Sequence, residues 1–87
     1  MKRVAVEQLT LNVEADHLSE VFGSFGPVSR ASVAYDETTG LSKGFGFVEF
    51  FDASDAATSL IFMNGAVIDG NTIRASFIGD SEEVENS

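Results

Sequence analysis

The sequence feature that most constrains this chain is an eight-residue run near its middle, Lys43–Phe50, which reads KGFGFVEF. Its aromatic and β-branched residues favour a strand, and successive side chains of a strand point to opposite faces. Val48 and Phe50 therefore share one face and suit a hydrophobic core. Phe45 and Phe47 fall on the opposite face, together with a charged glutamate. The run predicts a strand that presents two aromatic rings away from the core.

Two aromatic rings on a polar, solvated face are unfavourable unless another group stacks on them. Unpaired nucleobases are the natural candidates, because their flat faces stack on aromatic side chains. The alternative is that a chain terminus, a second domain or a protein partner covers both rings. The run alone leaves both possibilities open.

Length and charge limit what the chain can be. Its 87 residues are enough for one domain, and its apolar fraction of 44% is typical of a globular protein. The formal net charge of −9 argues against a general nucleic-acid binder, which is usually basic.

Four acidic residues lie close to the end of the chain: Asp80, Glu82, Glu83 and Glu85. We expect residues 1–79 to form the domain and residues 80–87 to be an acidic flexible tail, which could alternatively fold over basic residues of the domain.

Hydrophobic periodicity predicts the order strand, helix, strand, strand, helix, strand, over residues 3–8, 15–25, 28–35, 43–50, 53–63 and 72–78. Asp52 suits the N-cap of the second helix. In the last strand, we expect Ile73, Ala75 and Phe77 to face the core. This order predicts an α+β fold, the ferredoxin-like βαββαβ sandwich, with a four-stranded antiparallel sheet, two helices on one face and the other face open.

The basic residues are few, but most of them point toward the same face of the predicted sheet. Four of the five fall on the outward-facing phase: Arg3, Arg30, Lys43 and Arg74. They therefore project toward the same open face as Phe45 and Phe47. Positive charge around aromatic rings suits a single-stranded nucleic acid. Solvated strand faces also carry arginines that bind nothing, and this alternative stays open for each of them taken singly.

The run Lys43–Phe50 matches all eight positions of the octamer signature of the RNA recognition motif family. With the βαββαβ order, the chain resembles that family over nearly its whole length. The resemblance implies that Phe45 and Phe47 stack on single-stranded RNA and that Lys43 contacts a phosphate. We expect the same RNA to contact the arginines of the open face: Arg3, Arg30 and Arg74.

The first strand departs from the family's pattern. The family has a hexamer there of the form apolar, aromatic, apolar, any residue, Asn, Leu, whereas residues 4–9 read VAVEQL. Ala5 replaces the aromatic residue and Gln8 replaces the asparagine. Stacking one nucleobase is worth about 1–3 kcal/mol, so the missing ring weakens RNA binding by roughly 5- to 150-fold. Because the domain is also acidic, we expect a dissociation constant on the order of 10 μM or poorer.

Within this family, the chain is similar to the subfamily of the RNA-binding protein with serine-rich domain and the plant serine/arginine-rich splicing factors. The similarity rests on four short patterns, in which x is any residue: LTxNV at residues 9–13, DHLxExF at 16–22, LSKG at 41–44 and MxGxxIDG at 63–70. It implies a nuclear role in mRNA processing and splicing. It also implies docking on a splicing or exon-junction protein partner.

A protein adaptor is therefore the alternative function. Ile61 and Phe62 lie off the core-facing stripe of the second helix, and an exposed apolar pair there could dock a protein partner. The pair could instead pack against neighbouring loops, and the sequence leaves both arrangements open.

The residue types of the chain do not favour an enzyme. The chain has no cysteine, and His17 is its single histidine. No cluster has the spacing of metal ligands, so we expect no catalytic residues, no metal site and no cofactor. No apolar run approaches the length of a membrane-spanning helix, so we expect no membrane partner. Separately, we expect the domain to be a monomer in isolation.

Overall fold

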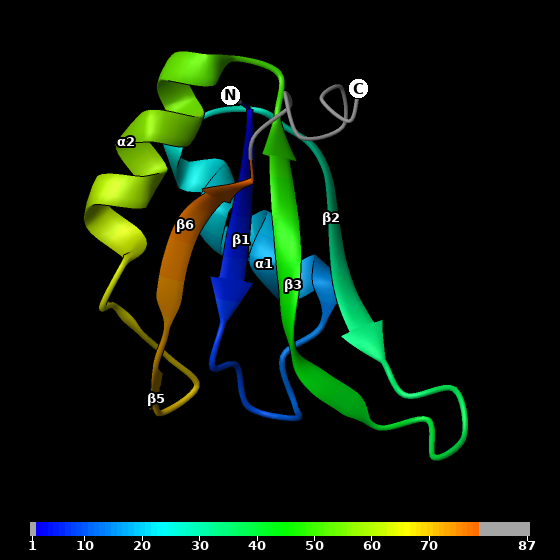
Figure 1. Cartoon of the computed structure of the whole chain (residues 1–87). Helices are drawn as coiled ribbons and strands as arrows, with labels where there is room; N and C mark the ends of the chain where they lie inside the picture. Colours follow the sequence, from blue (N-terminus) through cyan, green and yellow to red (C-terminus); the bar gives the residue numbers. More distant parts are fainter. Residues whose placement is uncertain (1, 79–87) are drawn as a thin grey trace.

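The computed structural model describes residues 2–78, which form a four-stranded antiparallel sheet, two α-helices and a short hairpin (Figure 1). The strands of the sheet are β1 (Arg3–Glu7), β2 (Val28–Tyr35), β3 (Ser42–Phe50) and β6 (Arg74–Ile78). The helices are α1 (Ala15–Phe22), followed by the 3₁₀ turn η1 (Gly23–Phe25), and α2 (Ala53–Met63). The hairpin consists of β4 (Val67–Ile68) and β5 (Asn71–Thr72). The expected α+β, ferredoxin-like βαββαβ sandwich is confirmed, and the expected acidic tail, residues 80–87, lies outside the described residues.

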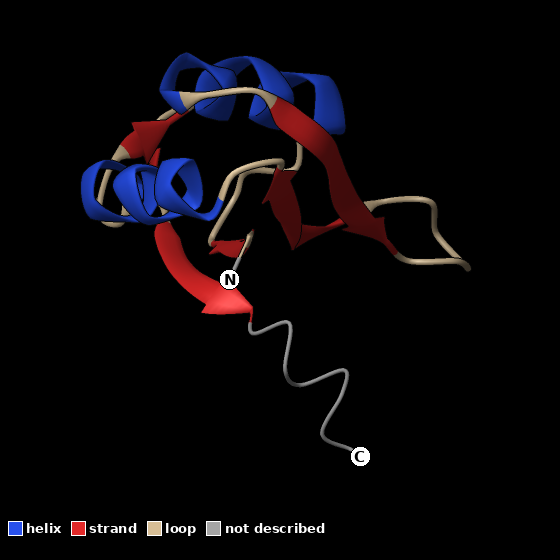
Figure 2. Ribbon diagram, turned by 90° about the horizontal axis from the view of Figure 1, so that it is seen from above, coloured by secondary structure: helices blue, strands red, loops and turns tan. Residues whose placement is uncertain are grey.

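The strands lie in the order β2-β3-β1-β6, so β3 and β1 are interior strands and β2 and β6 are the edges of the sheet. The register places Ala5 of β1 opposite Phe47 of β3 and opposite Ser76 of β6. Both helices cover the same face of the sheet (Figure 2). Among residues 2–78, no helix lies on the other face, which we call the open face.

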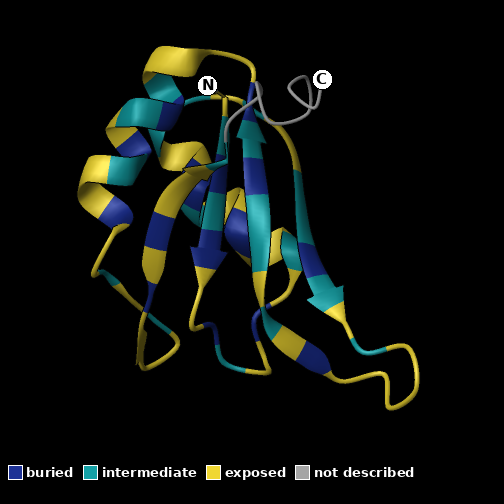
Figure 3. Ribbon diagram, viewed as in Figure 1, coloured by how far each residue is buried: buried dark blue, intermediate teal, exposed yellow. Residues whose placement is uncertain are grey.

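The hydrophobic core lies between the sheet and the two helices. Its largest fully buried side chains include Phe22 of α1 and Phe50 of β3, whose ring centroids are 6.5 Å apart. Along β1, buried Val4 and Val6 alternate with less buried residues, as the colours of Figure 3 show. Burial stabilises each apolar side chain of this size by about 1.5–3 kcal/mol relative to leaving it exposed. This one-sided core fixes which face of every strand points outward.

The first helix is shorter than expected. It was expected to extend to Phe25, but α1 ends at Phe22 and the next three residues form η1. Gly23 follows Phe22, and glycine is a poor helix former. Pro27, shortly after, cannot continue a helix.

Phe77 is not buried as expected, because its side chain is 37% exposed. It lies opposite Val4, on the core-facing phase of β6. However, β6 is an edge strand with a neighbouring strand on one side only, so a side chain near its end is covered from fewer directions. The prediction was therefore right about the phase of Phe77 and wrong about its burial.

The last strand also begins later than expected, at Arg74 rather than Thr72. Residues 71 and 72 pair with β4 instead, in the hairpin that precedes β6. This hairpin is tied to the connection after β1, because Thr10 Oγ1 donates to Asp69 Oδ2 at 2.5 Å and Asn71 Nδ2 donates to the Gln8 carbonyl oxygen at 3.1 Å.

Asp52 caps α2 as expected. Its carboxylate accepts hydrogen bonds from the backbone N–H and the hydroxyl of Ser54, each at 3.0 Å. These bonds, the backbone one most, together with the charge of Lys2, lower the pKa of Asp52 from its ordinary value of 3.8. A carboxyl whose pKa is lowered in the folded state stabilises the fold above its ordinary pKa, and this contribution is lost as the pH falls through the folded-state value.

Gly46 allows β2 and β3 to approach each other closely. A methyl group on Gly46 would overlap the backbone carbonyl oxygen of Ser32. By contrast, a methyl group on Gly23, in η1, would have no other heavy atom within 4 Å. The two glycines therefore make a matched pair, one confined and one with space around it.

We predict that Gly46→Ala lowers the free energy of unfolding by about 2–3 kcal/mol, because two backbones must move apart to accept the methyl group. Gly23→Ala should leave stability unchanged or raise it by up to about 1 kcal/mol, because alanine restricts the unfolded chain. Urea unfolding followed by circular dichroism measures both. Equal stability of the two variants would contradict the close packing of β2 on β3.

Candidate nucleic-acid interface

The open face is formed by alternate residues of all four strands of the sheet. The register of the strands places on it Phe45, Phe47 and Glu49 of β3, Arg3, Ala5 and Glu7 of β1, Arg30, Ser32 and Ala34 of β2, and Arg74, Ser76 and Ile78 of β6. Most of the sequence-predicted site residues therefore lie on one surface.

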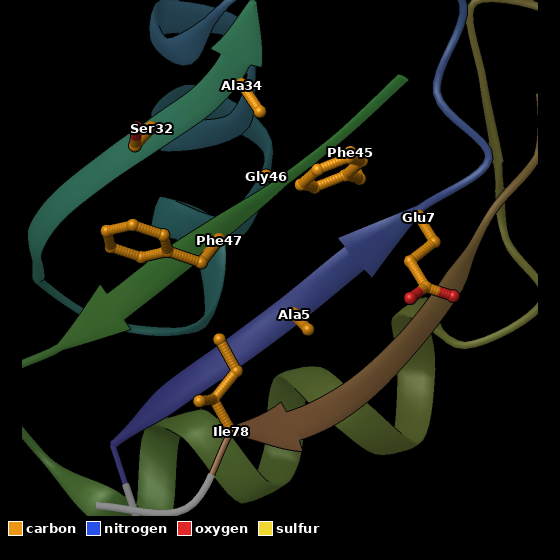
Figure 4. Close-up of a pocket in the computed structure, with 8 residues that line it drawn as sticks. All are labelled: Ala5, Glu7, Ser32, Ala34, Phe45, Gly46, Phe47 and Ile78. Carbon is orange, nitrogen blue, oxygen red and sulfur yellow. The ribbon is translucent and has the colours of Figure 1, made fainter. Parts of the chain in front are cut away.

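Both phenylalanine rings lie outside the core. Phe45 is 45% exposed, and Phe47 is half-buried. Figure 4 shows the two rings on the same side of β3, with Gly46 between them. The structure thus places an exposed aromatic surface on an interior strand, where neighbouring strands hold its backbone on both sides.

A hollow of about 340 Å³ lies beside these rings. It is lined by side chains from all four strands of the sheet, namely Ala5, Glu7, Ser32, Ala34, Phe45, Phe47 and Ile78, and by Gly46. Ala5 lies in its middle, with the phenylalanine rings on one side and Ile78 on the other (Figure 4). The hollow therefore occupies the position at which the family pattern has an aromatic residue. Its volume is at the lower end of the range for small-molecule sites.

Arg3 and Arg30 converge on Phe47 from the two neighbouring strands. Their guanidinium carbons lie 5.9 Å and 5.7 Å from the centroid of the Phe47 ring, within the range of a cation–π interaction. The same two arginines form ion pairs with Glu49, whose Oε1 is 3.6 Å from Nε of Arg3 and 3.1 Å from Nε of Arg30. The structure thus joins an aromatic ring, two cations and one anion in a single cluster.

Lys43 and Arg74 are exposed and lie outside this cluster. Arg74 is opposite Glu7 in the register of β6 and β1. Along β3, Lys43 is exposed like Phe45, two residues further on, whereas Ser42 before it is buried. Within residues 2–78, no ion pair or ring contact joins Lys43 to the cluster, so its part in the site stays a prediction.

Sequence reasoning missed the role of Glu49 as the partner of both arginines. The pairing follows from the strand register of the structure, in which Glu49 is directly opposite Arg3 and directly opposite Arg30. Opposite charges at facing positions of neighbouring strands attract each other. Alternation alone places residues on a face, but it does not reveal which residues are opposite each other.

The helical side of the molecule carries a separate apolar surface. Ile61 is 74% exposed and Phe62 is 65% exposed. The ring of Phe62 stacks on Phe25 of η1, with a centroid separation of 5.9 Å and an interplanar angle of 15°. Phe62 therefore both packs on a neighbouring segment and remains largely exposed, while Ile61 is exposed.

Other kinds of site are not apparent in the described part of the chain. Within residues 2–78, no group of three or more histidine, cysteine, aspartate or glutamate side chains is arranged to hold a metal ion. No helix in the same range is long and apolar enough to cross a membrane.

A plant splicing factor is similar in sequence to most of this chain. The serine/arginine-rich splicing factor SR45 of Arabidopsis thaliana is 42% identical over 72 residues, which are 83% of this chain and 17% of that protein. The chain thus spans only a small part of this relative. The expected similarity to plant serine/arginine-rich splicing factors is confirmed.

Solved structures share the fold. The second RRM domain of the yeast poly(U)-binding protein Pub1 superposes with a TM-score of 0.82 at 29% identity, over 92% of this chain and 96% of that one. The RRM of RNA15 superposes with a TM-score of 0.85 at 22% identity, over 93% of each chain. The sequence profile of the RNA recognition motif matches residues 4–74, which include the whole octamer. The chain therefore belongs to the RNA recognition motif family, a family of RNA-binding domains rather than enzymes.

Proposed function

We propose that this domain binds single-stranded RNA weakly through the open face of its sheet. The observation that carries the proposal is the surface around Phe47, where two aromatic rings and two guanidinium groups lie together and no helix of residues 2–78 covers them. Phe45 and Phe47 stack on nucleobases, while Lys43, Arg3, Arg30 and Arg74 supply positive charge near the phosphates. RNA is favoured over duplex DNA because stacking on a sheet requires unpaired bases.

Two features make the binding weak. Ala5 offers no ring at the middle of the face, so one stacking interaction is missing. The chain also carries a formal net charge of −9, which repels a polyanion at long range. We expect a dissociation constant on the order of 10 μM or poorer.

The similarity to an Arabidopsis splicing factor supports a role in mRNA processing and splicing, and with it a nuclear location. The similarity covers 17% of that relative, so it supports the RNA-binding step and not the whole activity of the relative. In such a role, weak binding by one domain suffices where neighbouring domains or partner proteins raise the local concentration of RNA.

A second function, docking of a protein partner on the helical side, is supported by the exposure of Ile61 and Phe62. These residues lie on α2, which packs on the face of the sheet opposite the RNA-binding surface. A splicing or exon-junction protein could therefore bind while RNA occupies the open face.

We predict that Phe45→Leu and Phe47→Leu each weaken RNA binding by roughly 5- to 150-fold, because leucine keeps the apolar volume but loses the stacking surface. Fluorescence anisotropy with a short labelled single-stranded RNA measures this change. Phe62→Leu on α2 is the matched control and should leave RNA affinity unchanged. Unaltered binding by both open-face variants would rule out the sheet as the RNA-binding surface.

We predict that Ala5→Phe tightens RNA binding by roughly 5- to 150-fold, because the new ring adds a stacking platform within the hollow. Ala5→Leu fills the same space without an aromatic face and should give little gain. Parallel anisotropy titrations of the two variants compare them. An equal gain for both would show that filling the hollow, rather than stacking, determines affinity.

We predict that Ile61→Asp and Phe62→Asp each reduce recovery of splicing or exon-junction proteins from nuclear extract by at least about tenfold, because a charge at the centre of an apolar contact is costly. Both variants should retain wild-type RNA affinity. Ser19→Asp adds the same charge on the exposed surface of α1 and should leave recovery unchanged. Full recovery with both α2 variants would exclude this face as the docking surface.

A further inference from the structure

Glu49 lies on the open face between two arginines. The strand register places it opposite Arg3 on β1 and opposite Arg30 on β2. Its Oε1 accepts a hydrogen bond from Nε of Arg30 at 3.1 Å and lies 3.6 Å from Nε of Arg3. One carboxylate oxygen therefore interacts with both guanidinium groups.

This arrangement also fixes where the two positive charges lie. Because the Arg30 and Arg3 guanidinium carbons are 5.7 Å and 5.9 Å from the centre of the Phe47 ring, the ion pairs form at the edge of a stacking platform. The Glu49 and Arg3 side chains are only 26% and 25% exposed, so water screens their pair incompletely. Arg30 is 63% exposed and is open to a ligand that approaches the face.

A carboxylate oxygen and a phosphate oxygen bind a guanidinium group in the same way, through charge-assisted hydrogen bonds. We propose that Glu49 is an internal competitor of RNA phosphate, which holds Arg30 and Arg3 in the free protein and yields them to RNA only in exchange. The inference rests on the proposed RNA-binding function and explains part of its weakness. Exchanging one anion for another gives little net gain, although the two arginines lie next to Phe47.

Lys43 and Arg74 differ from the arginines of the cluster. Within residues 2–78, neither of them has an acidic side chain at ion-pair distance. A phosphate that binds either of them therefore displaces no carboxylate of residues 2–78. In the wild type, these two residues supply most of the phosphate contacts.

The salt dependence of binding counts such contacts. On single-stranded nucleic acid, the logarithm of the binding constant falls with the logarithm of salt concentration by roughly 0.7 per phosphate contact. Two contacts, from Lys43 and Arg74, give a slope of about −1.4, whereas a third contact from a released Arg30 gives about −2.1. The slope therefore distinguishes engaged arginines from arginines held by Glu49.

The test is Glu49→Gln, which keeps the shape of the side chain and removes its charge. We expect RNA affinity to rise by about 3- to 20-fold and the salt slope to steepen by about 0.7, the contribution of one released arginine. Anisotropy titrations from about 50 to 200 mM salt, with a short labelled single-stranded RNA of mixed sequence, measure both quantities. Urea unfolding of the variant verifies that it remains folded.

Glu7→Gln is the matched control. Glu7 lies on the same face opposite Arg74 and makes no ion pair within residues 2–78. Its neutralisation changes the net charge by the same amount but releases no arginine. We expect about a twofold gain in affinity from this control and an unchanged salt slope, since no phosphate contact is added.

Arg30→Gln, made in both backgrounds, assigns the gain to the released arginine. It should cost about twofold in the wild type and about fivefold or more in Glu49→Gln, because only the second background lets Arg30 bind RNA without exchange. Equal costs in the two backgrounds would overturn the inference.

The remaining outcomes separate the inference from the function on which it rests. If Glu49→Gln and Glu7→Gln behave alike while Phe47→Leu weakens binding as predicted above, RNA binding by the open face stands and the competitor role of Glu49 fails. Weaker binding by Glu49→Gln would also overturn the inference, because it would show that the carboxylate orients the arginines toward RNA. If neither the wild type nor Glu49→Gln binds RNA, both proposals fail.

Discussion

The strand β3 must satisfy two different environments along a single length of chain. One set of its side chains, Val48 and Phe50, is fully buried against the helices, while Phe45 and Phe47 lie on the face that no helix of residues 2–78 covers. Because side chains alternate along a strand, a slip of one residue in register would bury Glu49 and expose the core. The packing that stabilises the fold therefore also determines that the aromatic rings face outward. Gly46, between the two rings, gives the neighbouring strand β2 the space it needs.

The electrostatics of the molecule follow from the same register. The chain is strongly acidic, yet the open face brings two arginines to one aromatic ring. Glu49 neutralises part of this positive charge at the point where a nucleic acid would use it. In the function proposed above, this neutralisation lowers the affinity of the open face for RNA. Such a domain suits assemblies in which several weak contacts act together.

Much of the fold could be predicted from the sequence, because the hydrophobic periods and the octamer are strong signals. The strand phase placed Phe45 and Phe47 correctly, since both lie in a regular part of β3. The prediction that Phe77 is buried was wrong, because side-chain alternation does not reveal which strand lies at the edge of the sheet. Lys43 is exposed, in agreement with the outward phase predicted for it, and its contact with RNA stays a prediction.

The partners within the site were harder to predict than its location. The pairing of Glu49 with Arg3 and Arg30 depends on how three strands align, and this alignment is set by the whole sheet. The hollow beside Ala5 likewise depends on Ile78, which lies at the end of the edge strand β6. Both features are products of tertiary structure, so residue patterns within one strand could not reveal them.

The central claim is that RNA meets the open face while the helices lie on the other side. Chemical-shift mapping of the ¹⁵N-labelled protein with a short single-stranded RNA tests it most directly. The account predicts that shifts are concentrated in β1 and β3, around Ala5, Phe45 and Phe47, and that α1 and α2 are unaffected. Shifts confined to the helices, or none at millimolar RNA, would contradict it.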